Sequence, residues 1–144
     1  GIDRFVSRAL HQEDYALAMG LSHPLAALDV IAAEALADNV MIARRNCEAL
    51  AETSRHFTAR GVRPFFAAKT NNDDRALALV RSGLGITVMP RSFACADIAM
   101  PRLAGFALKR CIGILIAPHA NTAQIEATAT HGAIVATVAA LAGA

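Results

Sequence analysis

The sequence predicts an α/β fold from three observations. Short apolar runs such as Val40–Ala43 and Ile86–Met89 are too short for helices and suit buried strands. Longer segments with helix-capping residues lie between such runs, and this alternation indicates a mostly parallel sheet with crossover helices. The chain has 144 residues, 55% of them hydrophobic, so it is expected to form one domain with a large core.

The best-marked unit is a helix, a glycine corner and a strand. Asn71–Asn72 can cap the helix, and Asp73–Asp74 place negative charge in its first turn, where the helix dipole favours it. Gly83 suits the left-handed position that ends a helix. Ile86–Met89 is then a predicted strand, and Pro90 ends it because proline has no N–H to donate.

Weaker patterns predict the elements before this unit. They are an alternating strand with one buried side at Glu13–Gly20, a short helix at Asp29–Ala37, a buried strand at Val40–Ala43, a helix at Cys47–Arg60 and an extended segment at Val62–Lys69. Asn46 is expected to cap the helix that starts at Cys47.

The elements after the unit follow the same alternation. A short helix is expected at Arg91–Ala99, strands at Phe106–Arg110 and Cys111–Ala117, and one helix from Thr122 to about Leu141. Asn121, with Gln124 three residues later, resembles a capping box for that last helix. At the other end, Gly1–Asp3 resembles the tail of a strand.

Composition argues against several classes of protein. Fourteen Lys and Arg against twelve Asp and Glu give a net charge of +2, without the basic stripe of a nucleic-acid binder. The three cysteines are far apart and form no Cys-x-x-Cys pair, so free thiols in a reducing cytoplasm are expected. No apolar run approaches the roughly 20 residues that span a bilayer, and no signal peptide is visible.

Two strand-to-helix loops form the candidate site. They are Ala43-Arg44-Arg45-Asn46 and Lys69-Thr70-Asn71-Asn72. Ligands of parallel sheets bind beyond the carboxyl ends of the strands, where helix N-termini offer free N–H groups. The loops therefore predict a site for an anion such as a carboxylate. The alternatives are a solvated pair for Arg44 and Arg45, pure capping for the asparagines, and a plain strand end for Thr70.

The sequence contains no recognisable catalytic motif. The five histidines lack metal-ligand spacing, and no Gly-x-Ser-x-Gly elbow occurs. Gly83-Leu84-Gly85 lacks the rest of a nucleotide-binding fingerprint. We therefore expect no catalytic residues, no metal and no cofactor.

Four pieces of the chain resemble the effector-binding domain of LysR-type transcriptional regulators. They are Leu17–Ala26 with its His-Pro-Leu-Ala, Phe57–Thr70, Ala78–Ser92, and Leu103–Ile116 with its Leu-x-Gly-Phe-x-Leu-x-Arg-x-Ile-Gly pattern. Their order and spacing together carry the resemblance, and Gly83–Pro90 is the strongest part.

The resemblance implies a two-lobed, periplasmic-binding-protein-like α/β domain of type 2 with a small effector in its cleft. Residues 1–24 and 100–144 would form the first lobe, and residues 25–99 the second. The family's ligand contacts in the second lobe correspond to Ala43–Asn46 and Thr70–Asn71, and Pro90 would close the cleft floor.

The chain departs from the family in two ways. The winged helix-turn-helix that binds DNA is absent, and the first strands and helices of the first lobe are missing, so we expect a C-terminal fragment with an incomplete first lobe. An unpaired sheet edge would favour self-association, as a homodimer or homotetramer. The predicted function is effector sensing in a cytoplasmic transcriptional regulator; the alternative is a ligand-binding protein or an enzyme on the same fold.

Overall fold

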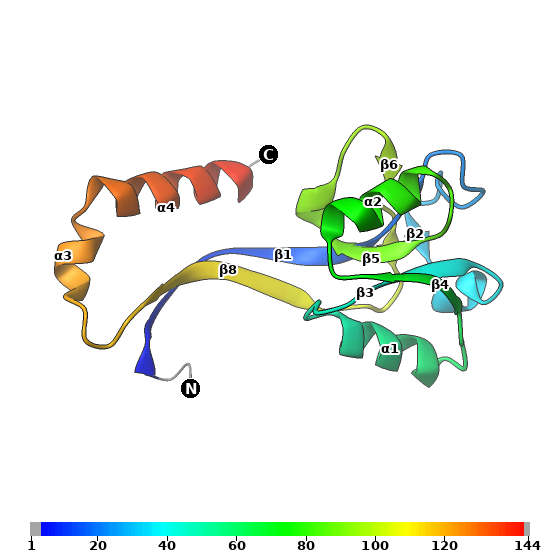
Figure 1. The fold of residues 1–144 in the computed structure, drawn as a ribbon, viewed down its shortest axis with the longest axis horizontal. Coiled ribbons are helices and arrows are strands. Elements are labelled where there is room, and N and C mark those ends of the chain that lie inside the picture. The colour runs from blue at the N-terminus through cyan, green and yellow to red at the C-terminus, as the bar shows by residue number, and fades with distance from the viewer. Residues whose placement is uncertain (1–3, 143–144) are drawn as a thin grey trace. The chain divides into compact units, whose positions relative to one another are not determined.

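The computed structural model describes residues 4–142, and the expected strand tail at 1–3 lies outside them. The strands are β1 (Val6–Gly20), β2 (Val30–Ile31), β3 (Val40–Arg44), β4 (Phe65–Thr70), β5 (Thr87–Pro90), β6 (Ile98–Ala99), β7 (Arg102–Leu103) and β8 (Lys109–Ile116) (Figure 1). The helices are α1 (Leu50–Ala59), α2 (Asp73–Arg81), α3 (Thr122–Glu126) and α4 (Ala129–Ala142), with short 3-10 turns at Ala33–Leu36 and Arg91–Phe93.

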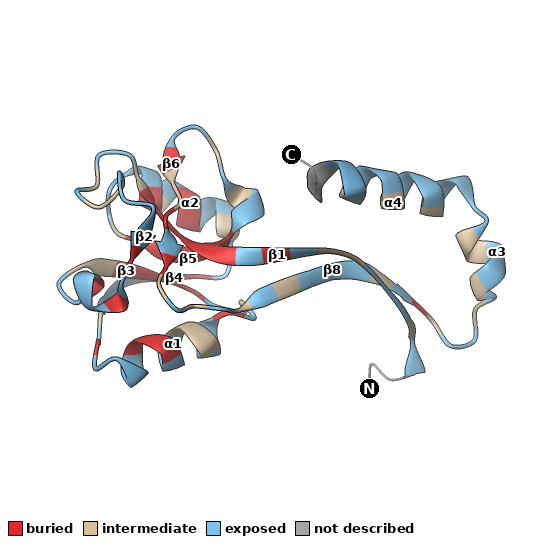
Figure 2. Ribbon diagram, turned by 180° about the vertical axis from the view of Figure 1, so that it is seen from behind, coloured by how far each residue is buried: buried red, intermediate tan, exposed pale blue. Residues whose placement is uncertain are grey.

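The chain forms two compact units. One comprises Gly1–Glu13 with Arg110–Ala144, and the other comprises Asp14–Lys109. We call them the terminal unit and the inserted unit. Buried residues are concentrated in the inserted unit (Figure 2).

The inserted unit is organised around the parallel pair β3 and β4, with α1 and α2 on opposite faces (Figure 1). Alternation along β3 separates two apolar clusters. Met41 packs in the cluster that contains Phe57 of α1, whereas Ile42 packs in the cluster that contains Leu77 and Val80 of α2. Adjacent side chains of β3 therefore pack against different helices.

The predicted corner after α2 is confirmed. Gly83 has a φ of 75°, in the left-handed region that only glycine adopts without strain. Gly85 lies so close to β3 that a Cβ there would be 2.6 Å from the carbonyl oxygen of Val40. The close approach lets Ile86 pair with Met41, which joins β5 to the β3–β4 pair.

The strands of residues 4–142 form three sheets, which corrects the expectation of one mostly parallel sheet. β5 and β6 pair with β1 in antiparallel orientation, whereas β3–β4 and β2–β7 are separate parallel pairs. Met41 and Ile86 add one isolated parallel bridge.

The expectation that the strand at Glu13–Gly20 has only one buried side is also wrong, because every residue of Tyr15–Met19 is buried. Leu17 packs in the cluster that contains Phe57 (the α1-side cluster), and Ala18 packs in the cluster that contains Leu77 and Val80 (the α2-side cluster). Both faces of this part of β1 are therefore covered.

Three predicted elements differ from the structure. Asp29–Ala37 contains the short strand β2 and one 3-10 turn in place of a helix, since Val30–Ile31 pairs with β7. Arg91–Ala99 contains a three-residue 3-10 turn followed by β6. The strand expected from Phe106 begins only at Lys109, because Gly105 makes a turn with a φ of 68°.

In the terminal unit, β8 pairs with β1, and Arg110 donates to Glu13 over 2.6 Å. The single helix expected from Thr122 to Leu141 is two helices. Asn121 caps α3 as predicted, with its side chain accepting from the N–H of Gln124 over 3.1 Å. Thr128 then starts α4 by accepting from the N–H of His131, so a second cap interrupts the first helix. Within residues 4–142, no helix is long and apolar enough to cross a membrane.

Candidate functional site

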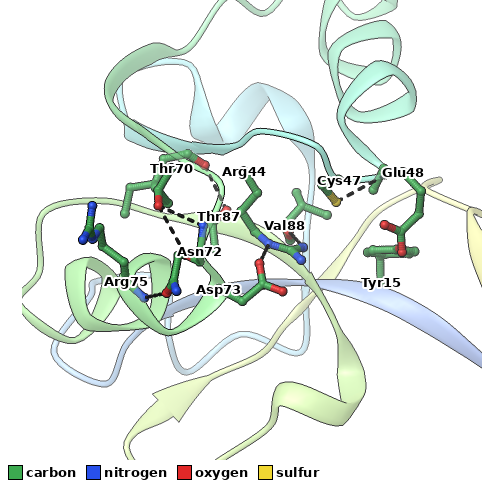
Figure 3. A network of polar contacts seen from close by, with 12 residues as sticks. Tyr15, Arg44, Cys47, Glu48, Thr70, Asn72, Asp73, Arg75, Thr87 and Val88 are labelled. Carbon is green, nitrogen blue, oxygen red and sulfur yellow. Dashed lines mark hydrogen bonds and ion pairs between the residues drawn. The ribbon is translucent and has the colours of Figure 1, made fainter.

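The two loops of the candidate site meet at the carboxyl ends of β3 and β4. Arg44 pairs with Thr70 in the strand register, and the N–H of Arg45 donates to the carbonyl oxygen of Thr70 over 2.6 Å. Thr70 is buried, and its hydroxyl accepts from the N–H of Asn72 over 3.1 Å (Figure 3). The loops therefore support each other through backbone and hydroxyl hydrogen bonds.

The side chain of Arg44 forms its hydrogen bonds on the α2 side of the sheet. Its Nε donates to Oδ1 of Asp73 over 2.8 Å, and its Nη1 donates to the carbonyl oxygen of Val88 over 3.1 Å (Figure 3). The guanidinium carbon lies 5.9 Å from the ring centroid of Phe93. Burial disfavours the charged form, but the hydrogen bond to Asp73 and nearby negative groups outweigh it and raise the pKa of Arg44. Arg44 thus holds β3, α2 and β5 together.

Arg45 and Asn46 are exposed at the end of β3. Asn46 has a φ of 58°, the only positive φ among the non-glycine residues that the structure describes. This left-handed residue turns the chain before α1 begins at Leu50, with Ala49 at the N-cap and no side-chain cap. The prediction that Asn46 caps a helix from Cys47 is therefore wrong; the sulfur of Cys47 instead accepts from the N–H of Ala49 over 3.4 Å.

The asparagine pair divides into two roles. The side chain of Asn72 accepts from the N–H of Arg75 over 2.8 Å and caps α2, as predicted (Figure 3). Asn71 is exposed beside it. Pro90 is fully buried at the end of β5, opposite Tyr15 of β1.

A cavity of about 930 Å³ adjoins the first loop. Its lining includes the loop residues Ala43, Arg44, Arg45 and Asn46, and it continues between α1 and the β3–β4 pair. The volume falls within the roughly 300–1,000 Å³ typical of small-molecule sites. Thr70, Asn71 and Pro90 are not among the lining residues.

Sequence reasoning missed the α1 side of this cavity. Phe57 and Val62 contribute apolar surface from α1 and the segment after it, and Phe66 contributes from β4. Phe57 was recognisable as part of a helical stripe, but nothing in the sequence showed that the helix leaves space against the sheet. Phe66 and Lys69 both line the cavity, although side chains three residues apart on a regular strand point to opposite faces.

Cys47, at the edge of the cavity, is half-buried. Burial raises the pKa of its thiol, and the N–H of Ala49 and the charge of Arg44 oppose that effect only in part. The thiol is therefore protonated at neutral pH and is a poor nucleophile. Across residues 4–142, no group of three or more His, Cys, Asp or Glu side chains is placed to hold a metal ion.

Comparison with known proteins identifies the family. Residues 2–130 match the model of the LysR substrate binding domain. The search of curated proteins found no match.

Solved structures of LysR-type regulators share the fold. HinK, a LysR family transcriptional regulator from Pseudomonas aeruginosa, has a TM-score of 0.73 at 14% identity, over 97% of this chain and 49% of HinK. The CcmR regulatory domain of Synechocystis PCC6803, solved with 2-PG, has a TM-score of 0.72 at 14% identity, over 96% and 67%. The QuiR effector-binding domain, solved with shikimate, has a TM-score of 0.67 at 17% identity, over 95% and 64%.

These matches confirm the predicted fold class, the periplasmic-binding-protein-like α/β fold of type 2. The chain spans about half the length of HinK. It belongs to the family of LysR substrate-binding domains.

Proposed function

We propose that this chain is the effector-sensing part of a LysR-type transcriptional regulator and that its ligand is a small carboxylate. The observation that carries the proposal is Arg45. It is exposed at the end of β3, lines the cavity, and has no carboxylate within ion-pair distance among residues 4–142. An unpaired guanidinium beside an apolar cavity is suited to bind a carboxylate through two parallel hydrogen bonds.

The other site residues have graded roles in this proposal. Ala43 and Asn46 line the cavity on either side of Arg44 and Arg45. Asn71 offers an exposed amide from the second loop, outside the cavity lining. Thr70 and Arg44 position the two loops, through the contacts to Asn72 and Asp73. Pro90 is a buried support at the end of β5.

The proposal extends to the whole regulator. Residues 1–24 and 100–144 belong to the first lobe and residues 25–99 to the second, and DNA is bound only by a separate N-terminal domain. The regulator works in the cytoplasm as a homodimer or homotetramer without catalysis. Ligand binding shifts an equilibrium between two arrangements of the lobes, to an extent limited by the difference in its affinity for them.

A thermal-shift screen with a panel of small carboxylates tests the proposal. It should be run on this chain and on a longer chain that carries the upstream half present in the relatives. A ligand at 100 times its Kd adds about 2.7 kcal/mol to the free energy of unfolding. Arg45→Ala should abolish the shift, whereas Arg75→Ala, which removes an exposed arginine of α2, should leave it unchanged.

The alternative is a ligand-binding protein or an enzyme on the same fold. Turnover of a ligand that binds would favour an enzyme. A panel in which no carboxylate stabilises either chain would count against both a carboxylate ligand and the assignment of Arg45.

A further inference from the structure

The cavity extends well beyond the loops at the ends of the strands. It runs beneath α1, from Arg45 and Lys69 at the carboxyl ends of β3 and β4 to Arg63 and Pro64, which precede β4. Lys69 lies six positions after Arg63, and an extended chain covers about 20 Å over that interval. A small carboxylate bound at Arg45 would leave most of this space empty.

A β-bulge gives the cavity its mixed lining. In the register of β3 and β4, Met41 pairs with Phe66 and Ile42 with Ala68, so Ala67 is an extra residue on β4. Ala68 packs in the α2-side cluster, whereas Phe66 and Lys69 both line the cavity on the α1 side. The bulge thus brings an aromatic ring and an ammonium group, three residues apart, to the same face.

Charge and apolar surface are separated along the cavity. Its apolar lining includes Met41, Phe57 and Val62, which are buried, and Phe66, which is exposed. Among the residues that the structure describes, Glu48 is the one acidic residue that lines the cavity, and it accepts a hydrogen bond from the hydroxyl of Tyr15.

Three cations line the cavity besides Arg44. Arg45, Lys69 and Arg63 have no carboxylate within ion-pair distance in the described part of the chain. Two of the three stand together at the loop end, where Ala43 pairs with Lys69 and Arg45 follows two residues later. The loop end is therefore the strongest site for an anion.

We propose that the cavity beneath α1 binds an anionic amphiphile, a monocarboxylate with an extended apolar body. The carboxylate lies at Arg45 and Lys69, and the apolar body lies beneath α1 against Met41, Phe57 and Phe66. This inference rests on the proposed function, because it assumes that the chain binds a carboxylate, and it adds the class of that carboxylate. The ligand is distinguished from a small polar acid by the apolar surface that it buries.

Calorimetric titration of the 144-residue chain with linear alkanoates, from butanoate to decanoate, tests the apolar part. Each methylene buried beneath α1 should tighten binding about fourfold. Phe66→Ser should weaken decanoate binding about tenfold and leave butanoate binding unchanged. Phe65→Ser is the matched control, since Phe65 is the neighbouring ring, is 69% exposed and does not line the cavity.

The position of the carboxylate is tested with matched charge variants. Lys69→Gln should weaken every alkanoate to a similar degree, and Arg63→Gln at the other end should change none of them. An equal loss in both variants would overturn the orientation of the ligand.

The possible failures are distinguishable. If butanoate and decanoate bind equally well, or hydroxylated polar acids bind better, the amphiphile is wrong while the carboxylate sensor stands. If no carboxylate binds at all, both proposals fail. If alkanoate affinity falls as protein concentration rises, a second copy of the chain occupies the cavity, and the proposed ligand class is overturned.

Discussion

At the scale of single residues, Arg44 shows how a candidate ligand contact can be a structural cation. Only 7% of its side chain is exposed, and its charge is balanced by Asp73. Replacing Asp73 by Asn would leave a buried guanidinium with a weaker partner. We expect Asp73→Asn to lower the free energy of unfolding by about 1–3 kcal/mol, measured by urea denaturation.

Asp74 supplies the control for that measurement. It is the neighbouring carboxylate in the first turn of α2 and is exposed, and Asp74→Asn removes the same helix-dipole contribution without unpairing Arg44. Equal losses in the two variants would show that the dipole, and not the Arg44 pair, accounts for the effect.

His56 predicts a dependence of stability on pH. The side chain of His56 is buried, and its ring centroid lies 5.2 Å from the ring centroid of Phe106. Nη1 of Arg60 lies 3.1 Å from Nδ1 of His56. Burial and then the charge of Arg60 lower the pKa of His56, although Ala104, Glu34 and Glu52 act in the opposite sense. The unfolded chain therefore binds a proton more readily than the folded one. The stability from neutral His56 is complete above the unfolded pKa of about 6.5 and is lost as pH falls below it.

Urea midpoints measured between pH 8 and pH 5 check this prediction. The midpoint should fall below about pH 6.5 in the parent chain, and His56→Gln should flatten that part of the curve. His119→Gln, at an exposed histidine, should keep the parent slope. A slope that survives in His56→Gln would assign the pH dependence to another group.

At the scale of elements, the two asparagines before α2 are expected to differ in role. Asn72 caps the helix, and Asn71 contributes to the proposed site. Asn72→Ala removes the acceptor for the N–H of Arg75 and should cost about 0.5–2 kcal/mol of stability. Asn71→Ala should leave the urea midpoint near the parent value and weaken carboxylate binding. The reverse pattern, with Asn71 stabilising the fold, would remove Asn71 from the proposed site.

The elements that sequence analysis predicted well are those with local causes. The helix α2 has a cap, acidic residues in its first turn and a left-handed Gly83 beyond its end, all within a short stretch. The start of α1 was mispredicted because Asn46 adopts a left-handed turn, a role that asparagine shares with helix capping. Tertiary packing accounts for the other errors: both faces of Tyr15–Met19 are buried, and β7 holds Val30–Ile31 as a strand.

The candidate site shows the same division. Strand ends, capped helices and cationic loop residues can be recognised in sequence, and together they predict Arg45 as a site residue. The cavity beneath α1 could not be predicted, because it depends on the bulge at Ala67 and on how closely α1 approaches the sheet. Neither feature has a local sequence signal.

At the scale of the whole molecule, the terminal unit predicts self-association. α4 carries no charged residue, and large apolar side chains are exposed at Ile112 (36%), Leu115 (52%) and Ile134 (43%). Exposed apolar surface of this kind favours association with another chain. Sedimentation velocity should show a mass that rises with protein concentration, and Leu115→Glu should reduce that rise. A constant monomer mass from micromolar to millimolar concentration would contradict the prediction.

The ion pair between Asp14 and Lys109, 3.0 Å long, joins the first and last residues of the inserted unit. A segment whose two ends meet can be placed in a surface loop of another protein without stretching that host, and its own ends can be linked and reopened elsewhere. In this chain the two ends lie within strands, Asp14 in β1 and Lys109 in β8, so the chain enters and leaves the inserted unit at one place.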